Sequence, residues 1–170
     1  MATVLGGTRP KFKPIAPDLF EHVLAGAALV LLGAVLIALA RGWGEWNRIP
    51  GTVWAHLVTI TVATALTPVM LLRRRGDPLH RRLWWVWAGA MILTAAISFA
   101  IRDINRGGLS FIHILSAWTL IQVPIIIWSA RMHNLKRHRG SVRGTVTGAL
   151  LVAGFFTFPF DRLLGHWLFG

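Results

Sequence analysis

Histidine is the residue type in this sequence with the clearest capacity for chemistry. The chain has 7 histidines and no cysteine. Without cysteine, the sequence excludes disulfides, thiolate metal ligands, cysteine nucleophiles and covalent c-type haem attachment. Imidazole is a good axial ligand for b-type haem and a common ligand of copper and zinc. The histidines are therefore the first candidates for a cofactor site.

His56 and His113 form the first candidate pair. His56 lies about one turn inside the outer end of the second long apolar segment, and His113 lies within a turn of the outer end of the fourth. At ~1.5 Å per residue their depths differ by only a few Å. Two histidines at one depth on different helices are what a bis-histidine haem requires, and His56 and His113 are also the predicted ligands of any metal ion. The alternative is that each ring bonds a backbone carbonyl or a lipid headgroup. The arginines available for haem propionates would be Arg48, Arg102 and Arg106.

A second pair, His80 and His138, lies toward the opposite boundary and predicts a second, weaker haem site. Both histidines are surrounded by arginines, for which a lipid phosphate is a simpler partner. The same basic cluster predicts a lipid, phosphate or quinone site, although a membrane protein carries such residues on its cytoplasmic side in any case. The arginines predicted to bind lipid phosphate are Arg73, Arg74, Arg75, Arg81 and Arg82.

Long apolar segments must position these histidines. Of the 170 residues 55% are hydrophobic and 14% charged, which is typical of a chain whose solvent is lipid. A helix crossing the ~30 Å hydrocarbon core needs about 20 apolar residues. The sequence predicts an all-α, polytopic transmembrane bundle of four to five spans, with residues 1–18 as a cytoplasmic leader and 19–170 as a single domain. The predicted spans are 19–40, 52–72, 83–101, 111–130 and 142–159, the last being short and rich in glycine.

The distribution of basic residues predicts the orientation. Of the 18 Lys and Arg residues, 13 lie in the leader and in the loops at 73–82 and 131–143, and five lie on the other side. By the positive-inside rule the N-terminus is cytoplasmic, in a bacterial inner membrane. Cleavage after Ala38-Leu39-Ala40, as a signal peptide, is the alternative for the first segment. Net charge +12 otherwise suggests nucleic acid, but no basic helix face is present, so no nucleic-acid partner is expected.

The acidic residues argue against a proton- or cation-coupled transporter. All 6 of them are predicted at or outside the membrane boundaries, whereas such transporters place carboxylates within their spans. Small residues indicate helix packing instead: Gly140, Gly144 and Gly148 share one helix face, and Gly26 and Gly33 are expected to act similarly in the first span. A further stripe, predicted to face the interior of the second span, consists of His56, Thr59, Ala63 and Thr67.

Four segments within Gly51 to Leu164 carry histidine motifs: 54–57, 78–82, 107–120 and 136–139. They contain a histidine in a span, then Leu-His-Arg before the next span, then Ile-His-x-Leu-Ser-x-Trp, and finally His-Arg. This order resembles the pattern of an uncharacterised bacterial family, a domain of unknown function found in small polytopic membrane proteins. Here Trp84 and its neighbours replace the family's Gly-Arg-x-Tyr, and Arg139-Gly140 replaces paired arginines and a Met.

The resemblance implies a membrane bundle and singles out His56, His80, His113 and His138, but it implies no activity. The layout of two histidines at each boundary is also similar, at the level of fold, to that of di-haem cytochromes b. The first hypothesis is thus a small b-type haem-binding or redox-associated membrane protein. The alternatives are a non-catalytic accessory subunit of a larger bioenergetic membrane complex, and a lipid- or quinone-binding module. Whether the chain is an enzyme does not follow from its sequence.

Overall fold

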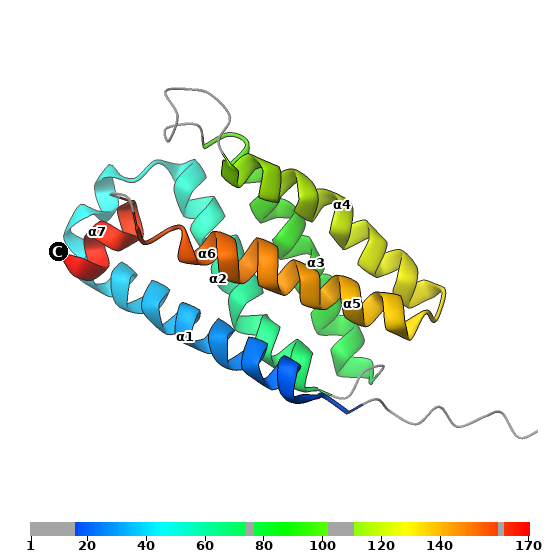
Figure 1. Cartoon of the computed structure of the whole chain (residues 1–170). Helices are drawn as coiled ribbons and strands as arrows, with labels where there is room; N and C mark the ends of the chain where they lie inside the picture. Colours follow the sequence, from blue (N-terminus) through cyan, green and yellow to red (C-terminus); the bar gives the residue numbers. More distant parts are fainter. Residues whose placement is uncertain (1–15, 74–76, 102–110, 160–161) are drawn as a thin grey trace, which may run out of the picture.

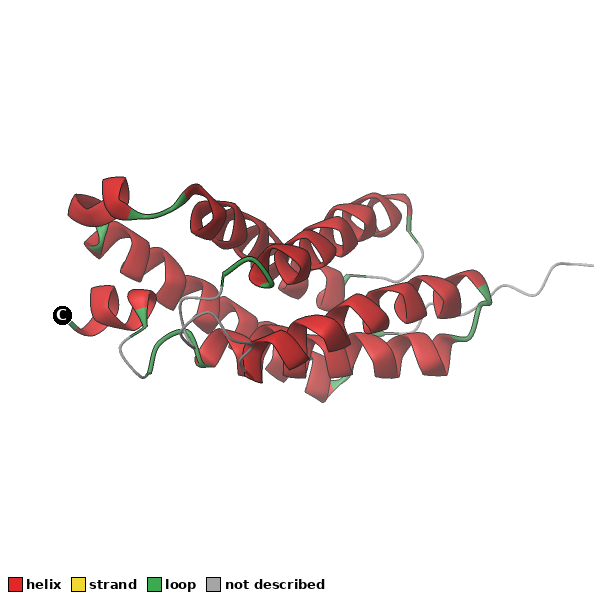
Figure 2. Cartoon of the chain, turned by 90° about the horizontal axis from the view of Figure 1, so that it is seen from above, coloured by secondary structure: helices red, strands yellow, loops and turns green. Residues whose placement is uncertain are grey.

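The computed structural model describes residues 16–73, 77–101, 111–159 and 162–170, and every regular element among them is helical, as the sequence predicts (Figure 2). Figure 1 shows their arrangement. In chain order they are α1 (Leu19–Arg41), the 3₁₀ helix η1 (Trp43–Arg48), α2 (Gly51–Leu72), α3 (Pro78–Ser98), α4 (Phe111–Arg131), α5 (Leu135–Thr145), the π-helix η3 (Val146–Val152), α6 (Ala153–Phe155) and α7 (Leu163–Phe169).

Capping side chains explain where α1, α3 and α5 begin. The Asp18 carboxylate accepts a hydrogen bond from the backbone N–H of Glu21 at 3.1 Å, and the Glu21 carboxylate accepts one from the backbone N–H of Asp18 at 3.2 Å. The Asp77 side chain caps α3 by accepting a hydrogen bond from the backbone N–H of His80, and the Asn134 side chain caps α5 by accepting one from the backbone N–H of Arg137. All three caps lie at one end of the bundle, which we call the α5 end (Figure 1). The opposite end, where α2 and α4 begin, is the α7 end.

The helices form a closed ring. Each of α1 to α4 packs against the next, α4 packs against α5 and η3, and η3 returns to α1. In Figure 1 the run α5–η3–α6 accordingly lies between α1 and α4. The predicted polar stripe of α2 faces this interior, since Ala63 and Thr67 are buried and Thr67 accepts a hydrogen bond from the Trp87 indole at 3.0 Å. The ring therefore encloses both apolar and polar side chains.

Within the described residues, three helices are long and apolar enough to cross a membrane: Leu19–Arg41, Gly51–Leu72 and Ile112–Arg131. Large apolar side chains on the outer face of α1, such as Val30, are exposed, as expected of a lipid-facing helix. Five spans are not confirmed. Helices form over most of the predicted spans 83–101 and 142–159, up to Ser98 and Phe155. However, α3 takes in Arg81 and Arg82 at its start, and the last run begins with the polar α5. The predicted inner membrane and N-terminal orientation stay predictions.

Glycines allow close packing in the last run but not in α1. A Cβ atom at Gly148 would lie 2.9 Å from the Trp118 ring of α4, and one at Gly144 would lie 3.8 Å from it. These two glycines therefore let α4 approach within the same chain. At Gly140, Gly26 and Gly33 an added Cβ would meet nothing within 4 Å, so the prediction that the two α1 glycines pack against a neighbour is wrong for this chain alone.

The C-terminal helix α7 docks on the end of α1. Arg41 donates a hydrogen bond to the Leu168 carbonyl at 2.6 Å, and the Trp167 indole donates to the Glu45 carboxylate at 3.0 Å. The Trp167 ring lies against Gly42, where any side chain would collide with it. These contacts fix α7 across one end of the ring.

Candidate functional site

A large cavity lies inside the ring toward the α7 end. Its volume is about 750 Å³, within the range of roughly 300–1,000 Å³ that small-molecule and cofactor pockets occupy. Its walls are mainly apolar, and α2, α3 and α4 supply most of its polar side chains. The polar lining consists of His56, Thr61, Thr64, Thr94, Ser98, His113, Ser116, Thr119, Thr157 and Arg162.

The two histidines of the first predicted pair both line this large cavity. His56 comes from the second turn of α2, and its ring interacts with the backbone of Thr94 in α3. Its Nδ1 atom is buried and has no hydrogen-bond partner among the described residues. His113 comes from the first turn of α4, is 3% exposed and lies 5.6 Å from the Phe99 ring, centroid to centroid. The structure thus brings both residues to one space, while their role as ligands stays a prediction.

Hydrogen-bonded hydroxyl groups join the helices around the large cavity. The Thr94 hydroxyl of α3 donates to the Thr59 hydroxyl of α2 at 2.7 Å. The Ser98 and Ser116 hydroxyls, of α3 and α4, lie 2.5 Å apart and share a hydrogen bond. Buried hydroxyls need such partners, so these pairs fix the relative positions of the three helices. Both histidine-bearing helices are therefore held against α3.

Arg162 is the one arginine or lysine among the described residues that line the large cavity. It is half-buried at the start of α7, and none of the described residues lining the cavity carries a carboxylate. The sequence predicted other arginines, namely Arg48, Arg102 and Arg106, as partners for haem propionates. Arg48 is exposed and does not line the cavity, and Arg102 and Arg106 lie outside the described residues.

The second predicted pair lines a much smaller cavity toward the α5 end. This small cavity has a volume of about 20 Å³ and is lined by both His80 and His138. Nδ1 of His138 lies 3.2 Å from the Ile126 carbonyl oxygen, and its ring lies 6.0 Å from the Trp84 ring. A space of this size holds about one water molecule. The structure brings these histidines together, but without room for a haem.

The predicted lipid-phosphate arginines have several different environments. Arg73 forms an ion pair with Asp77 at 2.7 Å. The backbone N–H of His80, followed by Arg73, lowers the pKa of Asp77 below its usual value. Arg81 and Arg82 are exposed, and Arg74 and Arg75 lie outside the described residues. A role in lipid or phosphate binding stays a prediction.

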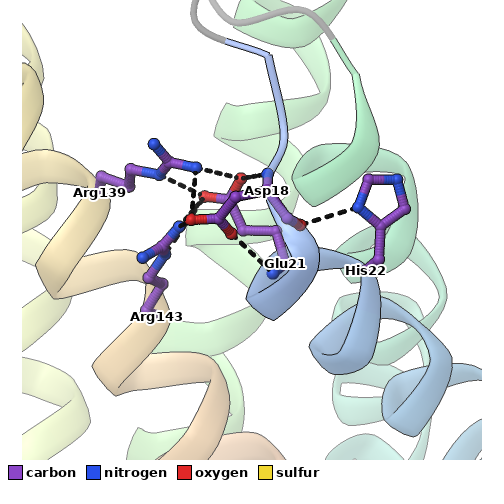
Figure 3. A network of polar contacts seen from close by, with 5 residues as sticks. All are labelled: Asp18, Glu21, His22, Arg139 and Arg143. Carbon is purple, nitrogen blue, oxygen red and sulfur yellow. Dashed lines mark hydrogen bonds and ion pairs between the residues drawn. The ribbon is translucent and has the colours of Figure 1, made fainter.

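An ion-pair cluster at the α5 end was not predicted (Figure 3). Glu21 is fully buried, and Arg139 donates two hydrogen bonds to its carboxylate, each of 2.9 Å. Arg143 lies 3.3 Å from the same carboxylate, and both arginines also contact Asp18. We call these four residues the ionic clasp, because they join the first turn of α1 to α5.

The ionic clasp contains two carboxylates and two guanidinium groups, so their charges balance. A buried carboxylate is costly unless it is paired and hydrogen-bonded, as Glu21 is here. The hydrogen bond from Arg143 lowers the pKa of Asp18 below its usual value. Two spacings could have indicated the cluster: the Asp-x-x-Glu capping pattern at the start of α1, and Arg139 and Arg143 four residues apart on one helix face.

The ligand set at the large cavity suits haem iron better than a bare metal ion. Among the residues that the structure describes, no group of three or more histidine or carboxylate side chains is arranged to hold a metal. Protein zinc sites take at least three protein ligands. Haem iron requires only two axial ligands, because the porphyrin supplies four nitrogens. Two histidines on one cavity agree in number with the axial ligands of haem iron, while haem binding stays a prediction.

Comparisons with protein-family models, with curated proteins and with solved structures found no match for this chain. The resemblance to a family of small polytopic membrane proteins stays a prediction.

Proposed function

We propose that this chain is a helical membrane protein that binds one b-type haem in the large cavity, with His56 and His113 as axial ligands. The observation that carries the proposal is that these histidines, from different helices, line one cavity of about 750 Å³. Bound haem would supply one-electron redox chemistry at this end of the bundle.

The walls of the large cavity support a porphyrin ligand. Apolar residues such as Leu57, Met91 and Leu164 line it, and a porphyrin is a flat, mainly apolar ring. None of the described lining residues is acidic, so nothing there repels the carboxylates of a haem. The proposal is limited to one haem, because the cavity beside His80 and His138 measures only about 20 Å³.

An absorption spectrum of the full chain tests the proposal. The protein would be expressed with a haem precursor supplied, purified in detergent and measured oxidised and reduced. We expect a Soret band, a sharp α-band on reduction and one haem per chain. Purified wild-type protein that has no Soret band would contradict the proposal.

Single substitutions locate the ligands. His56→Ala and His113→Ala should each lose the spectrum of a haem with two histidine ligands, because each removes one axial nitrogen. His166→Ala is the matched control, since His166 is exposed on α7 at the same end and does not line the large cavity. Circular dichroism should show that all three variants keep their helix content. Unchanged spectra for the two cavity variants would place the haem elsewhere.

A quinone is the second candidate for the same cavity. Nδ1 of His56 and Oγ1 of Thr61 are buried without a hydrogen-bond partner in the described part of the chain. A quinone carbonyl oxygen would accept a hydrogen bond from either group. Organic extraction of the purified protein distinguishes the candidates: a stoichiometric quinone in protein without a Soret band would favour the quinone.

A further inference from the structure

We infer that Arg162 binds the carboxylates of the ligand in the large cavity, which for haem are its two propionates. The inference rests on the proposed function and extends it from the iron ligands to the edge of the porphyrin. It makes Arg162 a specificity-determining residue: the site should prefer a porphyrin with free propionates to one whose propionates are esterified.

The acidic side chains in the described part of the chain are all engaged elsewhere. Asp18 and Glu21 belong to the ionic clasp, Asp77 pairs with Arg73, and Glu45 accepts the Trp167 hydrogen bond. None of them lines the large cavity. Arg162 therefore has no acidic side chain as a partner among the described residues.

The other arginines at the α7 end that the structure describes do not share this position. Arg41 donates its hydrogen bond to the Leu168 carbonyl, and Arg48 is exposed and does not line the large cavity. Arg162 is half-buried and lines it. A guanidinium group at the edge of an apolar space is stabilised by a carboxylate placed within that space, because the surrounding dielectric is low.

The helix that follows Arg162 has a fixed position. This helix, α7, is fixed to α1 and η1 through Leu168 and Trp167. Within the C-terminal segment, Gly165 packs so closely on the Phe158 carbonyl that a Cβ atom could not fit. A guanidinium group on a fixed support can form two parallel hydrogen bonds to a carboxylate without much further ordering.

The experiment compares binding of haem and of haem dimethyl ester, which keeps the iron but lacks both carboxylates. We expect the wild-type chain to bind haem at least about 10-fold more tightly than the ester, as a charge-assisted hydrogen bond predicts. Arg162→Gln should bind haem about as weakly as the ester, with its ester affinity unchanged. Unchanged ester binding also shows that this variant folds.

Two further variants sharpen the result. Arg162→Lys keeps the positive charge but not the two-pronged geometry, so its preference for haem should lie between those of wild type and Arg162→Gln. Arg48→Gln removes an exposed arginine at the same end and should bind both porphyrins as wild type does. If Arg162→Gln fails to fold, Arg162→Lys decides the question. A preference of Arg162→Lys for haem over the ester that equals the wild-type preference would count against the two-pronged contact. A smaller preference than that of wild type would support the contact.

The outcomes separate this inference from the proposed function. A wild-type chain that binds neither porphyrin would contradict the haem proposal itself. A wild-type chain that binds both porphyrins equally, or an Arg162→Gln variant that keeps the full preference for haem, would overturn only the role of Arg162.

Discussion

Glu21 and Arg139 form a two-pronged ion pair between residues 118 positions apart in the sequence, with Nε and Nη2 of the arginine each 2.9 Å from a carboxylate oxygen. Glu21 is fully buried, and the Arg139 side chain is 24% exposed. This pair joins the start of α1 to α5 and so closes the helical ring at the α5 end.

Replacing Glu21 by glutamine should destabilise the protein strongly. Glu21→Gln leaves two guanidinium groups facing a neutral amide, and removing one partner of a buried ion pair costs about 3 kcal/mol or more. Thermal unfolding in detergent, followed by circular dichroism, should show a clearly lower Tm. Val23→Ala is the control, because Val23 is an exposed neighbour in the same helical turn and its side chain makes no hydrogen bond. Equal Tm values for the two variants would mean that the ionic clasp adds little.

The ionic clasp should also make the protein sensitive to acid. The pKa of Asp18 is lower in the folded chain than its usual value of 3.8. The unfolded chain therefore binds more protons between the two values, so the contribution of Asp18 is complete above the usual value and is lost as the pH falls through the lowered one. Asp77, whose pKa is also lowered, contributes in the same direction.

Measuring Tm from about pH 6 down to about pH 2 checks this sign. Asp18→Asn should be less stable than wild type at pH 6. It should also lose less stability on acidification, since one of the carboxyl groups that titrate in this range has been removed. A wild-type Tm that rises as the pH falls through this range would contradict the prediction.

Two glycines of one helical run should respond oppositely to alanine. Gly140→Ala should stabilise the chain by up to about 1 kcal/mol, because alanine favours helix and nothing lies within 4 Å of the added Cβ. At Gly148 the added Cβ would lie 2.9 Å from the Trp118 ring, so the helix would have to move away from α4. Gly148→Ala should therefore be the less stable variant in urea or thermal unfolding, and the reverse order would contradict this packing.

The absence of cysteine makes the predicted orientation directly measurable, since any introduced cysteine is unique. Arg48 is exposed at the end of η1, just before α2, and Lys136 is exposed in the first turn of α5. The starts of α2 and α5 lie at opposite ends of the bundle (Figure 1). If the N-terminus is cytoplasmic, a thiol reagent that cannot cross membranes should label Arg48→Cys in intact cells and Lys136→Cys only after the membrane is opened. The opposite labelling pattern would reverse the orientation.

Periodicity and length predicted the helices well, because apolar runs such as 19–40 and 52–72 leave the chain few alternatives to a helix. The depth of His56 and His113 along two such helices predicted that they could meet, and the structure places both on the large cavity. The third and fifth spans were less predictable, since α3 and α5 both contain arginines and their hydrophobic parts are short. Local sequence does not show that the polar residues before an apolar segment belong to the same helix as that segment.

Contacts between segments distant in sequence were the features that could not be predicted. Glu21 was placed at the membrane boundary from its neighbours alone, whereas its burial depends on Arg139 and Arg143, more than a hundred residues later. Arg162 was likewise missed, because its place at the large cavity depends on how α7 docks on α1. Both cases need the closure of the ring, which no single segment encodes.

The large cavity bears on folding as well as on binding. Side chains around a void have no partner atoms on one side, so they lose dispersion contacts that a packed interior provides. A ligand in the large cavity would supply such contacts to α1, α2, α3 and α4 together. A ligand that binds only the folded chain stabilises it by mass action, so the cell's supply of that ligand would govern how much of the protein accumulates.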